Sequence, residues 1–253
     1  MQQEKWLAQN RKMMGTQIVM CPEIERADPC IYFGKGFCLN CYAEKLWFLR
    51  KKSWKGRTKT PAKGLIRLGT WREILPQDYE RFKSLFSNRH FFLITRGLLP
   101  MWFYEKINSD QFCVNLQVSV DLINNKVIPT EEKLSEFSKL SKILYRFKTL
   151  PSNVDAFVKL PQKLGVSFCR IIETPLRLPY GQRLYDPTPI SKRLAKNLFF
   201  RCNTECIDCT KENETLVCAV NPEKYFDISC QLPQTKQTVF LPQGSFEYIF
   251  HSH

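Results

Sequence analysis

Three cysteines in one short segment have the residue type and spacing of a metal site. Cys38 and Cys41 are separated by two residues, and a loop with Gly34 and Gly36 separates Cys30 from Cys38. A Cys-x2-Cys pair can place two thiolates on one metal, and this loop is long enough to bring Cys30 to the same centre. Three thiolates leave one coordination position open, on an iron of an iron–sulfur cluster or on zinc. The alternative is three buried thiols of an ordinary core.

The segments on either side of the cysteines place them at the end of a strand. Residues 16–24 are β-rich and predict a strand, whereas the run from Tyr42 to about Lys52 favours a helix. The cysteines therefore lie in a loop that leads into a helix N-terminus, where the helix dipole favours thiolates and anionic groups.

The same strand-then-helix pattern recurs along the chain and predicts an α/β fold. We expect further strands at 64–70, 90–96, 112–121, 145–150 and 166–174. We expect helices at 75–86, 98–107, 129–144, 152–165 and 187–200. This alternation predicts a parallel sheet with helices outside, curled into a barrel or doubly wound. No GxGxxG segment is present, so a Rossmann dinucleotide site is not supported.

Polar residues follow or end most of the predicted strands. The carboxyl ends of parallel strands meet at one edge, and the cysteine loop leaves the first strand at that edge, so together they predict a pocket rim. For each residue alone, an ordinary polar group at a strand end is the simpler interpretation. These residues are Thr70, Arg72, Thr95, Arg96, Ser119, Asp121, Lys148 and Glu173.

A second group of cysteines follows the last predicted helix. Cys202, Cys206, Cys209 and Cys218 are separated by three, two and eight residues, a set that can close around one metal. An auxiliary iron–sulfur cluster, a structural zinc and unliganded thiols are the three interpretations, with Cys230 as a spare or a replacement for Cys218. We therefore divide the chain into a barrel-like domain, residues 1–200, and a small cysteine-rich, metal-binding subdomain, residues 201–253. Three further cysteines in predicted strands are interpreted as core thiols: Cys21, Cys113 and Cys169.

The chain of 253 residues is basic, with a net charge of +14. Such an excess favours nucleic acid, nucleotides or an acidic protein as partner, although it also serves solubility. Basic residues between Arg50 and Lys63 lie close to the aromatic residues Trp47, Phe48 and Trp54, as in surfaces that contact phosphates and stack on bases, or in a solvated basic face. The chain lacks an apolar run of about 18 residues and an apolar segment near its start. We expect a cytoplasmic protein without membrane contact, whose 11 cysteines are reduced.

The ending Cys38-Leu39-Asn40-Cys41-Tyr42-Ala43 resembles the cluster loop of radical S-adenosylmethionine (SAM) enzymes. It is most similar to a branch found in phages and bacteria. The segments 91–97 (FFLITRG) and 115–121 (NLQVSVD) also resemble strands of that branch. The spacing between Cys30 and Cys38 is longer than in the best-known loops of the superfamily.

The resemblance implies a fold and a set of site residues. The fold is a partial (β/α)6 TIM-like barrel, with a [4Fe–4S] cluster on Cys30, Cys38 and Cys41. The open iron would hold the amino and carboxylate groups of SAM, and Arg96 could pair with that carboxylate. Ser119, Asp121 or Glu173 could meet the amino group or the ribose hydroxyls. The segment GTWRE, at 69–73, lacks the glycine-glycine-acid pattern of the family. The other expected cofactor contacts are Tyr42, Thr70 and Thr95.

The function implied by the resemblance is radical chemistry. A reduced cluster gives one electron to SAM, and the 5′-deoxyadenosyl radical then removes hydrogen from a substrate, with nucleic acid, nucleotide or peptide as candidates. An electron donor such as flavodoxin or ferredoxin is an implied partner, and the C-terminal cysteines would hold a second [4Fe–4S] cluster or zinc. The alternative is a non-enzymatic, zinc-structured nucleic-acid-binding protein, which explains the charge but not the three-thiolate set.

Overall fold

The computed structural model describes most of the chain between Ile18 and Thr149 and short segments beyond it. The described residues are 18–25, 29–33, 35–38, 59–123, 126–149, 159–161, 163–165, 171–177, 183–184, 200–201 and 217–219.

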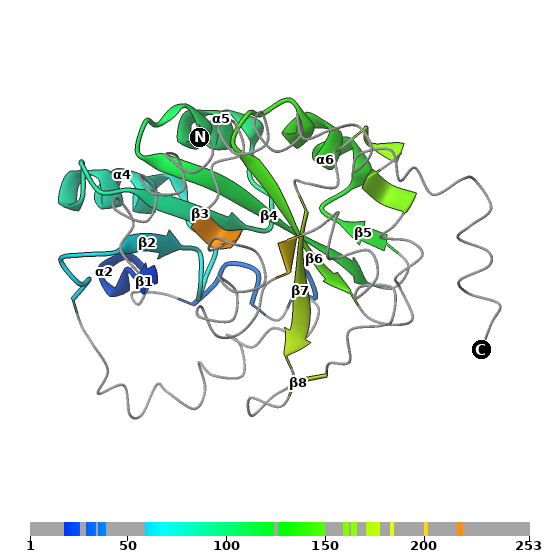
Figure 1. Cartoon of the computed structure of the whole chain (residues 1–253), viewed down its shortest axis with the longest axis horizontal. Helices are drawn as coiled ribbons and strands as arrows, with labels where there is room; N and C mark the ends of the chain where they lie inside the picture. Colours follow the sequence, from blue (N-terminus) through cyan, green and yellow to red (C-terminus); the bar gives the residue numbers. More distant parts are fainter. Residues whose placement is uncertain are drawn as a thin grey trace, which may run out of the picture.

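In the described residues, nine strands form one sheet and seven of them are parallel. Figure 1 shows the arrangement of this sheet. The parallel strands, in spatial order, are β1 (Ile18–Met20), β2 (Leu65–Leu68), β3 (Phe91–Thr95), β4 (Cys113–Ile123), β6 (Ile143–Thr149), β7 (Ile171–Arg177) and β9 (Phe200–Arg201). Two short strands add antiparallel pairs, β5 (Lys126–Ile128) on β4 and β8 (Arg183–Leu184) on β7.

The order of the parallel strands follows the order of the chain without a reversal. Each new parallel strand joins the same side of the sheet, whereas a doubly wound sheet reverses direction at a switch point. Among the described residues β1 pairs only with β2, so the sheet is open. The predicted α/β class and the parallel sheet are thereby confirmed.

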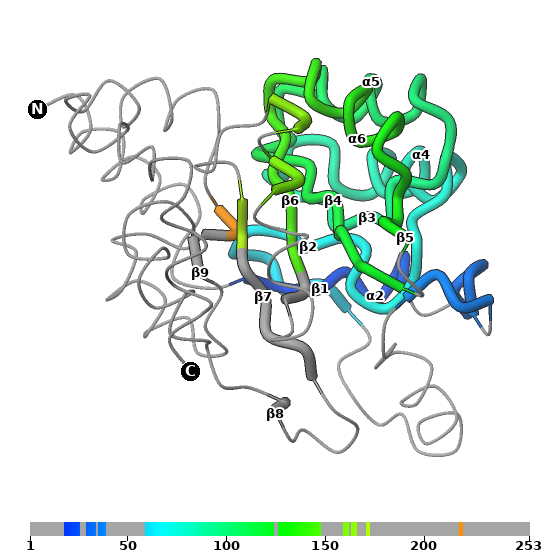
Figure 2. Tube along the Cα trace, turned by 90° about the vertical axis from the view of Figure 1, so that its right-hand side faces the viewer, coloured from blue at the N-terminus to red at the C-terminus, as the bar shows by residue number. Residues whose placement is uncertain are grey.

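Helices of the described part of the chain cover one face of this sheet (Figure 2). They are α4 (Pro76–Leu85), α5 (Met101–Ser109) and α6 (Glu131–Ser138). Pro76 lies in the first turn of α4, where its missing N–H costs nothing, and the Thr130 hydroxyl caps α6 by accepting from Lys133 N at 3.4 Å. None of the helices in the described ranges is long and apolar enough to cross a membrane.

Several predicted boundaries were wrong. The first strand, predicted at 16–24, ends at Met20 and is followed by the one-turn helix α2 (Pro22–Glu25). The helix predicted at 129–144 ends at Ser138, because Ile143 and Leu144 begin β6 and are buried on its two faces. In a short apolar run, helical and strand periodicity look alike, so only the partner strands decide. Phe200, predicted as the end of a helix, lies in β9, while 187–199 are outside the described residues.

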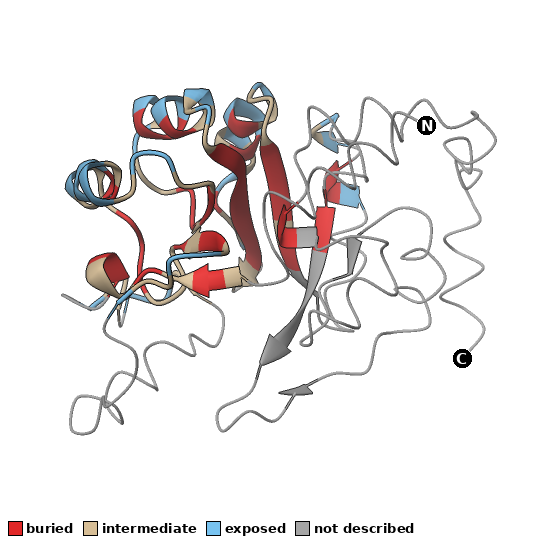
Figure 3. Ribbon diagram, turned by 60° about the vertical axis from the view of Figure 1, so that its left-hand side comes forward, coloured by how far each residue is buried: buried red, intermediate tan, exposed pale blue. Residues whose placement is uncertain are grey.

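The core lies between the helices and the sheet. Side chains on the inner faces of the helices are buried against the strands, and the outer faces are exposed (Figure 3). Aromatic rings dominate this layer, with Phe82 packed edge-to-face on Phe91 at 4.9 Å between centroids and Tyr104 tilted on Phe137 at 4.9 Å. Such pairs stabilise a fold beyond the burial of their area. The thiols of Cys21 and Cys113 are buried, which confirms them as core thiols, although Cys21 follows β1 instead of lying in it; Cys169 is outside the described residues.

The central strand β4 is buried on both faces but is apolar on only one. Leu116, Val118 and Val120 belong to the core under the helices. The residues between them are polar and face the other side of the sheet, since side chains alternate along a strand. They are Asn115, Gln117, Ser119 and Asp121, all buried. A buried polar face needs partners, and those partners form the site described below.

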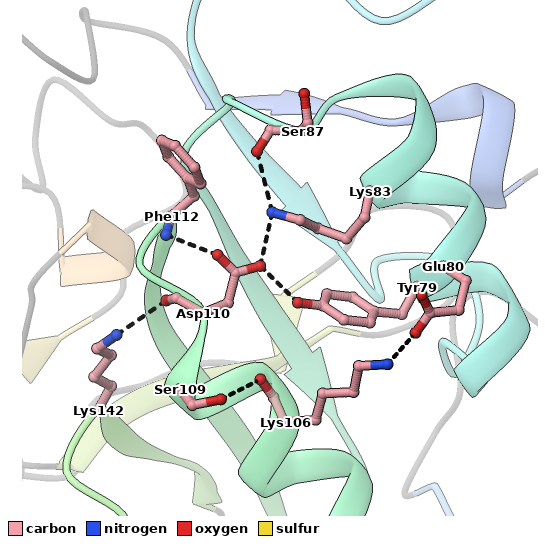
Figure 4. A network of polar contacts seen from close by, with 9 residues as sticks. All are labelled: Tyr79, Glu80, Lys83, Ser87, Lys106, Ser109, Asp110, Phe112 and Lys142. Atoms are coloured by element: carbon pink, nitrogen blue, oxygen red, sulfur yellow. Dashed lines mark hydrogen bonds and ion pairs between the residues drawn. The ribbon is translucent and has the colours of Figure 1, made fainter.

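The Asp110 carboxylate ties together the amino-terminal end of the sheet (Figure 4). Its Oδ2 accepts from Tyr79 Oη at 2.6 Å and pairs with Lys83 Nζ at 2.8 Å, and its Oδ1 accepts from Phe112 N at 2.8 Å. Lys142 Nζ donates to the backbone carbonyl of Asp110 at 3.0 Å. Burial acts to raise the pKa of Asp110, but the hydrogen bonds from Lys83 and Tyr79 outweigh it, so the pKa lies below its ordinary value.

We expect Asp110→Asn to lower the free energy of unfolding at pH 7 by about 2 kcal/mol, because it weakens hydrogen bonds to a buried charged group. Since the folded pKa of Asp110 lies below the unfolded value of 3.8, this stabilisation is present above that pH and is lost as pH falls through the folded pKa. Urea unfolding at pH 7 and at a series of lower pH values measures both effects. Glu80→Gln, which breaks the exposed pair of Glu80 with Lys106, is the control and should cost at most about 1 kcal/mol. A difference between Asp110→Asn and the parent that stays constant into acid would contradict the assignment.

Candidate functional site

Four segments meet at the carboxyl edge of the sheet. They are the cysteine loop within 29–38, the segment 69–75 after β2, the end of β3 at Thr95 and Arg96, and the end of β4 at Ser119 and Asp121. Parallel strands end at the same edge, so residues far apart in the chain become neighbours there. Charged and thiol side chains of these segments contact one another directly.

Arg96 is the centre of these contacts. Its Nε donates to Cys38 Sγ at 3.0 Å, and its Nη2 pairs with Asp121 Oδ2 at 2.8 Å. The Arg96 side chain is 9% exposed and that of Asp121 is 0% exposed, so the pair is shielded from water. Burial acts to lower the pKa of Arg96, but the charges of Asp121 and Cys38 outweigh it and hold that pKa above its ordinary value. The guanidinium therefore keeps its charge.

Glu73 connects Cys30 to Arg96. Its backbone N lies 3.4 Å from Cys30 Sγ, as donor to the sulfur. Its carboxylate accepts from Arg96 N at 2.9 Å and from the hydroxyl of Thr95. Burial raises the pKa of Glu73 to about 7, although the hydrogen bonds from Thr95 and Arg96 act in the opposite direction.

The described part of the cysteine loop contains two turns. Phe33 N donates to Cys30 O at 2.9 Å and Lys35 N to Tyr32 O at 3.1 Å, and Gly36 has φ of +71°. Burial, followed by the charges of Glu73, Cys30 and Cys38, raises the pKa of Tyr32. Cys30 and Cys38 thus face the same group of residues from the two ends of one loop.

Hydrogen bonds to residues of α2 hold the segment 69–75, which follows β2, in place. Trp71 N donates to Glu25 Oε2 at 2.7 Å, and Arg72 Nη2 donates to Ile24 O at 3.0 Å and pairs with Asp78 at 2.5 Å. Burial raises the pKa of Glu25 to about 7. These contacts hold Glu73 against the cysteine loop.

Thr95 positions Glu73 and is itself enclosed. Its hydroxyl donates to Glu73, accepts from Gly97 N at 2.9 Å, and lies 3.1 Å from the Tyr104 hydroxyl. The Tyr104 hydroxyl in turn accepts from Leu99 N at 3.0 Å, so donors and acceptors are matched along this chain of contacts. Thr95 is 2% exposed, and within the described part of the chain its hydroxyl positions the Glu73 carboxylate.

The remaining predicted residues are placed as follows. Thr70 is at the same edge, where its hydroxyl accepts from Arg67 Nε at 2.8 Å. Ser119 lies beside Arg146 in the register of β4 with β6, on the face shared with Asp121. Glu173 lies in β7, opposite Phe147 of β6. Cys41, Tyr42, Cys202, Cys206, Cys209 and Cys230 are outside the described residues.

Glu73 is the site residue that the sequence reasoning missed. The segment GTWRE, at 69–73, lacks the glycine-glycine-acid pattern of the family, so the resemblance implies no role for Glu73. The acid itself follows the strand end closely, and that position was a usable signal. Its contacts with Cys30 and Arg96 depend on β3 and the cysteine loop, which no local pattern describes.

Cys218 of the second cysteine group lies on the polar face of the sheet. It belongs to the short helix η4 (Val217–Ala219), and its carbonyl accepts from Asn115 Nδ2 at 3.0 Å and from Gln117 Nε2 at 3.1 Å. Its Sγ lies 3.7 Å from Arg146 Nη1. This part of the C-terminal region therefore packs on β4, and it satisfies the amides of the polar face.

The two cysteines at the edge fit a thiophilic metal in their chemistry and surroundings. Both thiols are half-buried and face amide and guanidinium donors, which stabilise a thiolate bound to iron or zinc. Arg96 Nη1 is buried and has no hydrogen-bond partner within the described part of the chain. This nitrogen can therefore donate to an anionic group bound at the edge. Among the described residues no three His, Cys, Asp or Glu side chains form a metal-binding group, and the third predicted ligand, Cys41, is outside them.

Comparisons with protein-family models, with curated proteins and with solved structures found no match to this chain. The class that the fold and the edge define is thus an α/β protein with an open parallel sheet, with thiols, an arginine and carboxylates at the carboxyl ends of its strands.

Proposed function

We propose that the chain is a radical SAM enzyme whose Cys30, Cys38 and Cys41 hold a [4Fe–4S] cluster. When bound, such a cluster supplies one electron that cleaves SAM to methionine and a 5′-deoxyadenosyl radical, which removes hydrogen from a substrate. The observation that carries the proposal is the meeting of both described cysteines with Arg96 and Glu73 at the carboxyl edge of the sheet.

The fold agrees with this proposal in one further respect. The parallel strands follow chain order and the helices lie on one face, which is how a (β/α) barrel grows. We infer an incomplete (β/α)6 barrel, in which the polar face of β4 is the inner one. A ligand at the edge would then be enclosed by the polar inner wall.

The chain's own residues have separable roles in this proposal. Arg96 holds the carboxylate of SAM through its buried Nη1, since a guanidinium binds carboxylates strongly. Two acidic groups would receive the amino group: Glu73, whose backbone N contacts Cys30 Sγ, and Asp121, which pairs with Arg96. Thr70, Ser119 and Glu173 lie in strands or strand ends of the same sheet and complete the rim. Tyr42 and the C-terminal cysteines keep their predicted roles, with a second [4Fe–4S] cluster or zinc at Cys202, Cys206, Cys209 and Cys218.

The net charge of +14 favours an anionic substrate, either a nucleic acid or a nucleotide, ahead of a peptide. It also favours an acidic electron donor such as flavodoxin or ferredoxin, because opposite charges speed encounter. The same charge supports the second candidate function, a zinc-structured nucleic-acid-binding protein without catalysis.

Anaerobic reconstitution with iron and sulfide tests the proposal. We expect a brown protein that forms 5′-deoxyadenosine from SAM in the presence of dithionite. An intact cluster that yields no 5′-deoxyadenosine would argue against the enzyme. Zinc in the purified protein, no uptake of iron and retention on nucleic acid would favour the second candidate.

A further inference from the structure

The guanidinium of the Arg96–Asp121 ion pair contacts a cysteine sulfur directly. The guanidinium donates from Nε to Cys38 Sγ at 3.0 Å, and its other arm pairs with Asp121 Oδ2 at 2.8 Å. Both charged side chains are nine-tenths buried or more. In surroundings with little water, a charge and a hydrogen bond act more strongly on a neighbouring group than at the surface.

We propose that this pair sets the reduction potential of the cluster bound through Cys38, with Arg96 raising it and Asp121 lowering it. The inference rests on the proposed function, because it needs an iron–sulfur cluster at Cys30, Cys38 and Cys41. An added electron makes the cluster and its sulfur ligands more negative. A hydrogen bond and a positive charge at the ligand sulfur stabilise that state, whereas a nearby negative charge opposes it.

The two residues therefore predict shifts of opposite sign. Arg96→Gln removes the charge and the Nε donor and should lower the potential. Asp121→Asn removes the negative charge with nearly the same shape and should raise it. If the pair served only to hold the loop in place, both substitutions would disturb the same contact and would not separate in sign.

Arg67 offers a matched control on the neighbouring strand. Its Nε donates to the Thr70 hydroxyl at 2.8 Å, not to a sulfur. Arg67→Gln removes the same charge from the same sheet, so it measures the contribution of charge without the hydrogen bond to Cys38. Its shift should be smaller than that of Arg96→Gln.

The experiment is a redox titration of the reconstituted full-length protein without SAM, followed by electron paramagnetic resonance. We expect Arg96→Gln to lower the potential by at least about 59 mV, the equivalent of a tenfold change in a one-electron equilibrium. Asp121→Asn should shift it in the other direction, and resonance Raman spectra should show altered iron–thiolate stretching only when the Cys38 contact is changed. Arg96→Lys, which retains the charge but not the planar donor, should fall between the parent and Arg96→Gln.

The outcomes separate the two proposals. If the parent takes up no iron–sulfur cluster, the proposed function and this inference both fall. If the cluster forms and SAM is cleaved but Arg96→Gln and Asp121→Asn shift the potential together or not at all, only this inference is overturned. If Arg96→Gln does not fold, Arg96→Lys decides, and a potential equal to that of the parent overturns the inference.

Discussion

Under the proposed function, Cys38→Ala will give a folded protein that takes up no iron–sulfur cluster and does not cleave SAM. Arg96 Nε contacts the Cys38 sulfur at 3.0 Å. The substitution therefore removes a proposed cluster ligand together with its contact with Arg96. We expect 5′-deoxyadenosine formation to fall by more than roughly 100-fold, beyond the range that the loss of an outer partner of a metal ligand costs. Iron and sulfide counts together with the visible absorption spectrum measure the effect.

Cys30→Ala should behave in the same way, whereas Cys113→Ala is the matched control. The Cys113 thiol is buried at the beginning of β4, at the opposite end of the sheet from Arg96. Its removal should lower stability slightly through lost packing and leave the iron count unchanged. Full iron content and SAM cleavage in Cys38→Ala would mean that the cluster is held elsewhere, and the candidate site would have to be abandoned.

Gly69→Ala will prevent the carboxyl edge of the sheet from forming. Gly69 follows the last residue of β2 and has φ of +78°, a conformation that other residues adopt only with strain. A Cβ atom at this position would lie 1.8 Å from Ile94 O and 2.9 Å from Ile94 C, both of them backbone atoms of β3. Because neither strand can move without breaking its pairing, we expect a loss of about 4 kcal/mol or more in the free energy of unfolding.

Gly165→Ala separates the strain of the backbone from the clash. Gly165 has φ of +64° but nothing within 4 Å of an added Cβ, so only the conformational cost of about 1–2 kcal/mol applies. Urea unfolding followed by circular dichroism compares the two variants at equal protein concentration. Equal losses of stability in both would show that the contact with Ile94 O carries no energy.

The class of fold could be predicted because each element leaves a local pattern. Apolar runs such as 90–96 and 112–121 mark strands, and the spacing of Tyr79, Phe82 and Leu85 marks a helix. Their alternation predicted a parallel sheet, and the described strands of that sheet lie where the runs do. Boundaries failed where one apolar run suits two elements, as at Ile143 and Leu144, because their burial depends on strands that lie elsewhere in the chain.

The candidate site was predictable only in part, for a related reason. Cys30 and Cys38 stand out by type and spacing, and Arg96 and Asp121 by their places at strand ends. Glu73 does not, since its role comes from contacts with residues far away in the chain. Cys218 stands out by its spacing in the second cysteine group, but its place on β4 could not be predicted. Cys218 meets Asn115 and Gln117 across more than 100 positions, a separation that no pattern of spacing reports.

Residue types and their periods thus determined by themselves that this chain forms strand–helix units with thiols in a loop between the first and second strands. The tertiary structure alone decided which polar groups face those thiols. Side-chain periodicity depends on the backbone of one element, whereas the pairing of Arg96 with Cys38 and Asp121 requires several elements to be aligned at one edge. That alignment arises from the register of the parallel strands, which is determined by packing across the whole sheet.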